Sequence, residues 1–69
     1  MDKDTANRML QAALALGSPI GELDTLISQL KDEKEKAEYV KALGDIIGIV
    51  SESFVRRIAR QYPELDPDR

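Results

Sequence analysis

The side chains that carry most enzyme chemistry are scarce in this sequence. Its 69 residues include no His and no Cys, so the usual zinc ligands and nucleophile–base pairs are missing. Asp45 and Glu52 lie seven residues apart on one predicted helix face, a spacing typical of solvated surface rather than of a catalytic pocket. No glycine-rich phosphate loop or calcium loop occurs. The sequence therefore predicts no enzyme, no cofactor and no metal site.

A basic cluster offers a different chemistry, contact with nucleic acid. Arg56, Arg57 and Arg60 lie near the end of a predicted helix, and residues 9–26 have the outline of a helix-turn-helix. Against this, the presumed recognition helix offers Glu22 and no Lys or Arg before residue 31, whereas base edges and phosphates need donors. Basic residues also suit a helix C-terminus. Nucleic-acid binding is therefore the alternative prediction, ranked second.

The overall charge also argues against binding to nucleic acid or to a membrane surface. The net charge is −3 and the pI is about 4.8, which disfavours a general affinity for nucleic acid or anionic lipid. A helix on a membrane surface would need a polar face rich in Lys and Arg, but Glu38, Asp45 and Glu52 interrupt that face. The first residues do not resemble a signal peptide, so the expected location is the cytoplasm.

The element that positions these groups is a long helix predicted over residues 33–61. Around Leu43, the spacing of apolar residues gives a stripe wide enough to face a core. This stripe consists of Tyr39, Val40, Leu43, Ile46, Ile47, Val50, Phe54 and Ile58. Asp32 is the expected N-cap, and the helix should end at Gln61 or Tyr62 because Pro63 disfavours helical geometry in the residue before it.

Two shorter helices are predicted before it, over residues 5–16 and 19–30. Asp4 or Thr5 is the expected cap of the first, and residues 1–3 are expected to fray. Gly17 is expected in the left-handed conformation between the helices, followed by Ser18 as N-cap and Pro19 in the first turn. A break is placed near residues 31–32, although no Gly or Pro excludes a continuous helix there. Residues 63–69 are expected to form an acidic tail, with Leu65 able to fold back.

These elements predict an all-α fold, a small three-helix bundle in one domain over residues 1–69. The third helix, counted over its 26 residues from 37 to 62, would extend roughly 39 Å against roughly 18 Å for the first, so part of its stripe would lack a neighbour. The predicted core is Leu10, Leu14, Leu23, Ile27, Leu43, Ile47, Val50 and Phe54. A second copy of the chain is the commonest way to cover such an excess.

Small residues on the long helix indicate where that copy would pack. Mid-helix Gly costs roughly 1 kcal/mol relative to Ala, so Gly44 and Gly48 suggest a close helix crossing. The apolar run is too short for a membrane span. The predicted interface is Gly44, Gly48, Ile49, Ser51, Val55 and Ala59. A competing account packs the Ala-rich flank of the first helix into this strip within one chain. The favoured hypothesis is a protein–protein interaction module, homodimeric and able to bind a further, unidentified protein.

Overall fold

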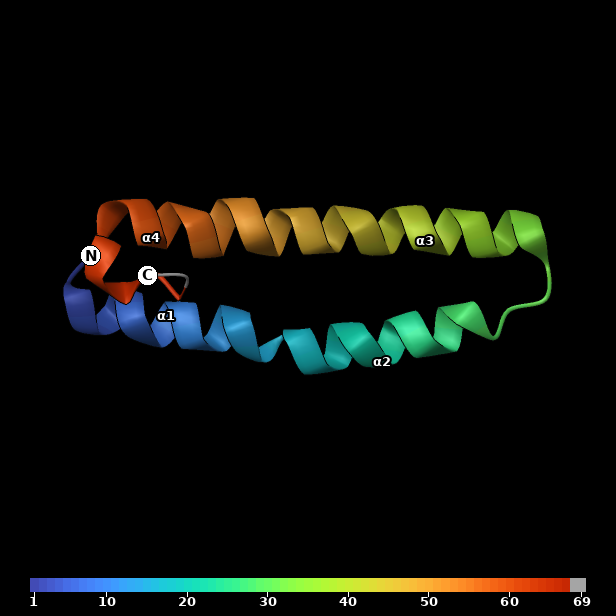
Figure 1. The fold of residues 1–69 in the computed structure, drawn as a ribbon, viewed down its shortest axis with the longest axis horizontal. Helices are drawn as coiled ribbons and strands as arrows, with labels where there is room; N and C mark the ends of the chain where they lie inside the picture. Colours follow the sequence, from blue (N-terminus) through green and yellow to red (C-terminus); the bar gives the residue numbers. More distant parts are fainter. Residues whose placement is uncertain (68–69) are drawn as a thin grey trace.

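The computed structural model describes residues 1–67, and this part of the chain is a helical hairpin without strands (Figure 1). The elements in chain order are α1 (Lys3–Ala15), α2 (Gly17–Ser28), α3 (Glu33–Gly48), the π-helical stretch η1 (Ile49–Arg56), α4 (Arg57–Gln61) and the 3₁₀ turn η2 (Pro63–Leu65). α1 and α2 run end to end as one arm, and α3, η1 and α4 form the return arm (Figure 1). The all-α class is confirmed. The three-helix bundle is wrong, because the chain forms two long helices.

The junction between α1 and α2 explains the difference. Gly17 does not take the left-handed conformation, since no glycine of the described chain has a positive φ. Instead Leu16 links the two helices: its N–H donates to the carbonyl of Ala13 at 3.2 Å, and its carbonyl accepts from the N–H of Ile20 at 3.0 Å. Leu16 itself keeps a right-handed helical conformation, so the chain does not turn here. Ser18 is therefore not an N-cap, and α2 begins at Gly17. Pro19 falls in the first turn of α2, where a missing N–H is tolerated.

Because the first arm is nearly straight, it opposes the whole return arm. Residues 3–28 extend about 39 Å and residues 33–61 about 44 Å, at about 1.5 Å per residue. The described chain measures 46 × 20 × 16 Å, so it is more than twice as long as it is wide. The expected unopposed length of the long helix is therefore wrong, since α2 covers it. The side chains that lack a neighbour therefore lie on the broad sides of the hairpin and not beyond the end of the first arm.

Side-chain caps define the start of each arm. Asp32 accepts hydrogen bonds from the N–H groups of Lys34, at 3.0 Å, and Glu35, at 3.3 Å, which confirms the predicted cap and the break before α3. At the other end Asp2, rather than Asp4 or Thr5, caps α1 by accepting from the N–H of Thr5 at 2.7 Å. The predicted fraying of residues 1–3 is thus wrong at Lys3, which is helical.

The cap on α1 also makes the stability of the protein depend on pH. The backbone N–H of Thr5 favours the charged form of the Asp2 carboxylate and so lowers its pKa. The contribution of this cap to stability is present above the ordinary carboxyl range and is lost as the pH falls through the lowered pKa.

The buried core lies along the seam between the arms. Its members are Ala6, Leu10, Ala13, Leu43 and Ile58. Leu10 and Leu43 confirm the prediction, and Ile27 and Val50 are half-buried. The other four predicted core residues, Leu14, Leu23, Ile47 and Phe54, are 41–45% exposed, so their assignment is wrong. Two helices contact each other along a single seam. The apolar stripe of the return arm is wide enough to contact two neighbouring helices, so one neighbouring arm covers only part of it.

The end of the hairpin that holds the N-terminus is closed by the C-terminal segment, residues 62–67. Ala6, Leu10 and Ile58 form a buried cluster against which Val55, Tyr62 and Leu65 pack. The Tyr62 hydroxyl donates to the carbonyl of Met1, and the ammonium of Lys3 lies 3.4 Å from a Glu64 carboxylate oxygen. The expected end of the helix at Gln61 and the return of Leu65 onto the core are both confirmed.

Candidate interaction surface

One broad side of the hairpin carries an apolar groove between α2 and α3. Its floor is the seam at Leu43, and Glu35 is its only charged lining residue. The groove is lined by Leu23, Leu26, Ile27, Leu30, Glu35, Tyr39, Ala42, Leu43 and Ile46. Since the exposed walls are almost entirely hydrocarbon, water gains little by staying there, and an apolar occupant would be favoured.

A second groove continues the first toward the closed end. It is lined by Met1, Met9, Ser53, Phe54, Arg57, Ile58 and Gln61. Ser53 follows Ile46 by seven residues, and Met9, Leu16 and Leu23 recur every seven residues, so on each arm the two grooves lie on the same side. We call this side the open face, made of Met9, Leu16, Leu23, Leu26, Tyr39, Ile46 and Phe54, each between 41% and 54% exposed.

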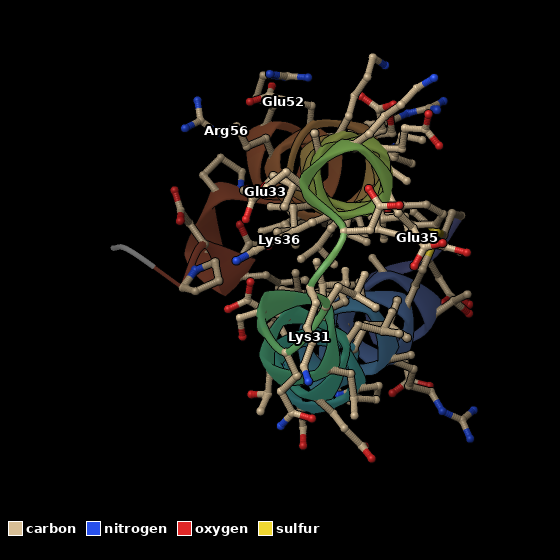
Figure 2. All side chains as sticks on the ribbon, turned by 90° about the vertical axis from the view of Figure 1, so that its right-hand side faces the viewer. Lys31, Glu33, Glu35, Lys36, Glu52 and Arg56 are labelled. Atoms are coloured by element: carbon tan, nitrogen blue, oxygen red, sulfur yellow. The ribbon has the colours of Figure 1, made fainter. Side chains whose placement is uncertain are left out.

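The open face lies opposite the C-terminal segment. Figure 2 looks along the hairpin from the turn and shows Glu35, which lines the first groove, on one side. Glu33 and Lys36 point to the other side, toward the C-terminal segment. The segment that closes the core on one side therefore leaves the open face uncovered.

The predicted glycine strip is open as well. Gly44 and Gly48 are exposed, and a Cβ built on either would meet no atom within 4 Å apart from the adjoining backbone and neighbours of its own helix. The Ala-rich flank of α1 therefore does not pack into the strip, so the competing within-chain account is not supported. Nothing in the single chain explains the cost of these two glycines.

The six residues of the predicted interface do not share one surface. Val55 and Ala59 are half-buried and, with Ser51, line a hollow beside Asp66 of the C-terminal segment. Ile49 is 55% exposed and does not line this hollow. The prediction that these positions form an interface therefore mixes two sides of the return arm.

The three arginines divide between two surfaces. Arg56 and Arg60 both line the hollow beside Asp66, and the Nε of Arg56 lies 3.3 Å from a carboxylate oxygen of Glu52 (Figure 2 labels Arg56 and Glu52). Arg57 lines the second groove instead, so the three do not form one patch. The helix-turn-helix part of the alternative also lacks its geometry, because α1 and α2 run in line whereas that motif joins helices at about 90–120° (Figure 1).

Catalytic and metal sites find no support in the described residues. Asp45 is paired with Lys41 at 3.1 Å and Glu52 with Arg56, all on the exposed outer side of the return arm. Residues 1–67 contain no buried polar side chain and no group of three or more potential metal ligands. Within the same range, no helix is both long and apolar enough to cross a bilayer.

The comparisons with known proteins give no match. No family model fits the sequence, and neither the search of curated proteins nor that of solved structures finds a significant similarity. What the chain does is therefore inferred from its own geometry.

The seven-residue recurrence on the first arm is the signal that sequence reasoning missed. Met9, Leu16, Leu23 and Leu30 can be read directly from the sequence as one stripe. The turn predicted at Gly17 divides this stripe between two helices. Once the arm is continuous, Met9, Leu16 and Leu23 of this stripe lie together on the open face.

Proposed function

We propose that this protein is a non-catalytic protein–protein interaction module that self-associates, covering the open face with a second helical layer. The observation that carries the proposal is the imbalance between buried and exposed apolar residues. Among residues 1–67, five hydrophobic residues are buried, two of them alanines, whereas twelve large ones are between 41% and 57% exposed, seven of them on the open face. Single exposed apolar residues are ordinary, but a continuous apolar face marks an interaction site.

The dimensions of the chain support the same conclusion. Its accessible surface is 5296 Å², against about 4300 Å² for a compact protein of 7.7 kDa. Its radius of gyration is 14.8 Å, whereas a compact chain of this length would have about 11 Å and one of twice the length about 14 Å. The hairpin therefore has the proportions of half a compact domain.

Stability gives a second reason for a partner. Domains below about 70–80 residues rarely gain more than 3–5 kcal/mol from one core, and small proteins usually add disulfides, a metal or oligomerisation. This chain has no Cys for a disulfide and no His for the commonest zinc sites. Self-association is the remaining device, and it requires no other component.

The test is the molecular mass in solution, measured by light scattering from low to high micromolar concentration. We expect a mass of twice the 7.7 kDa chain at the upper end. The unfolding temperature should also rise with protein concentration, because dimerisation stabilises the folded state by mass action. A chain that stays monomeric at high micromolar concentration, with a concentration-independent unfolding temperature, would contradict the proposal.

Nucleic-acid binding through Arg56, Arg57 and Arg60 remains the alternative, and no observation favours it over self-association. If these arginines contacted phosphates, the affinity would fall steeply with salt, and neutralising all three would flatten that dependence. We expect no binding to duplex DNA at physiological salt. Tight binding with that salt dependence would reverse the ranking.

A further inference from the structure

We infer that the second copy packs on the open face in antiparallel register, with each return arm over the same arm of its partner about a two-fold axis near Ile46. The inference rests on the proposed self-association and adds the surface, the occupant and the orientation. A two-fold interface uses the same patch on both copies, so the residues of that patch must complement each other across the axis.

The charged side chains that line the two grooves are placed so that a two-fold axis pairs opposite charges. Only Glu35 and Arg57 carry charged side chains among the residues that line the two grooves. Glu35 precedes Ile46 by eleven residues and Arg57 follows it by eleven. Antiparallel stacking about Ile46 therefore brings Glu35 level with Arg57 of the partner subunit, at both ends of the dimer. Opposite charges at the rim of an apolar interface fix register and orientation.

Other residues of both arms also lie at equal distances on either side of this axis. On the return arm, Tyr39 and Ser53 lie seven residues before and after Ile46. On the first arm, Leu16 and Leu30 lie seven residues before and after Leu23, which lines the same groove as Ile46. The stacking thus places Leu23 and Ile46 near their own copies at the centre. Tyr39 then lies level with Ser53 of the partner subunit, and Leu16 with Leu30 of the partner subunit, so on the return arm a large side chain faces a small one.

The other two-fold stacking lacks this complementarity. If both turns lay at the same end, both copies of Glu35 would share that end and both copies of Arg57 the other. Like charges would then lie together beside an apolar interface, which is unfavourable. The charges therefore select the antiparallel orientation.

The available area is adequate for a stable dimer. A face 46 Å long and 20 Å wide offers roughly 900 Å², close to the roughly 800 Å² that each partner contributes to a standard interface. The C-terminal segment lies on the opposite side, so it does not obstruct the approach of a second copy (Figure 2).

The first experiment compares two adjacent isoleucines of similar exposure. Ile46 is 41% and Ile47 45% exposed, but they lie about 100° apart around the helix, and only Ile46 lines the groove. Ile46→Glu should weaken dimerisation by roughly 30-fold or more, because it buries like charges at the axis. Ile47→Glu should change it less than fivefold. Both variants should keep the helical circular dichroism of the parent.

The second experiment tests the orientation by exchanging charges. Glu35→Lys and Arg57→Glu should each weaken the dimer about tenfold, because each places like charges together at both ends. The double variant E35K/R57E should recover the parent affinity. A double variant as weak as the singles would overturn the antiparallel register.

The outcomes separate this inference from the proposed function. A monomeric parent would contradict self-association itself. A dimeric parent whose Ile46→Glu variant dimerises as well as the Ile47→Glu variant would leave self-association standing and exclude the open face as its surface.

Discussion

The two ends of the hairpin share the same arms but differ in how they are covered. At the end that holds the N-terminus, α1 packs against η1 and against Ile58 of α4, and the C-terminal segment adds a third element, so Leu10 and Ile58 are 1% and 3% exposed. At the turn end, α2 packs against α3 alone. Leu43 is buried there, while Leu23 and Tyr39 remain 44% and 54% exposed.

The difference shows what a helix pair needs in order to bury its apolar residues. Two helices have one seam, and side chains on either edge of that seam stay in water until a further element covers them. The chain supplies this element at one end through Tyr62 and Leu65. At the other end it supplies none within the described residues, and we propose that a second copy does so.

The largest effect is expected at the closed end. Leu10→Ala removes the largest fully buried side chain and should cost about 2–5 kcal/mol, which would unfold much of a protein this small. The control is Leu14→Ala on the same helix, where the side chain is 42% exposed and the loss should be below about 1 kcal/mol. Urea unfolding monitored by circular dichroism gives both values. Equal losses would mean that the closed end is not the core.

A smaller effect should follow from removing the third element. Leu65→Ala takes away a half-buried side chain that packs on the cluster of Ala6, Leu10 and Ile58, so we expect a loss of about 1–2 kcal/mol. Amide hydrogen exchange should become faster in α1 and α4 and stay unchanged near the turn. Faster exchange at the turn end alone would contradict the division between the two ends.

The turn end depends on its cap. Asp32→Ala removes the acceptor for the N–H groups of Lys34 and Glu35 and should cost about 1 kcal/mol of folding free energy. Asp24→Ala, on the exposed side of α2, is the matched control and should be neutral within about 0.5 kcal/mol. Thermal unfolding at one fixed protein concentration measures both. A neutral Asp32→Ala would show that the cap does not stabilise the turn.

The smallest effect has the opposite sign and sharpens the assignment of the interface. Gly44→Ala and Gly48→Ala should each stabilise the protein by about 0.5–1 kcal/mol, because Ala favours the helix and its Cβ meets nothing within 4 Å. Gly21→Ala in α2 serves as control, since its surroundings are equally open. If a partner helix crosses at the glycine strip, the two variants of α3 would weaken the dimer, and the predicted interface there would replace the open face.

Local features of the sequence determined where the helices begin and end. The predicted ranges 5–16, 19–30 and 33–61 differ by at most two residues from those observed. Helix boundaries depend on hydrogen bonds between near neighbours, as at Asp32, and on the restriction that Pro63 imposes on Tyr62. The spacing of the open face can also be read from the sequence, but two of its residues, Leu23 and Phe54, are predicted in the core because the sequence favours three helices and the chain forms two.

Only the tertiary structure decided whether the chain reverses at residues 16–18. Gly17 permits both a left-handed cap and a continuing helix, and Pro19 is tolerated in either case because it stands in a first turn. The local free-energy difference between these outcomes is small. A straight first arm instead buries its seam against the whole return arm, from Leu10 at Ile58 to Ile27 beside Leu43. The free energy gained by this burial comes from contacts between residues far apart in the chain, so no local sequence pattern predicts it.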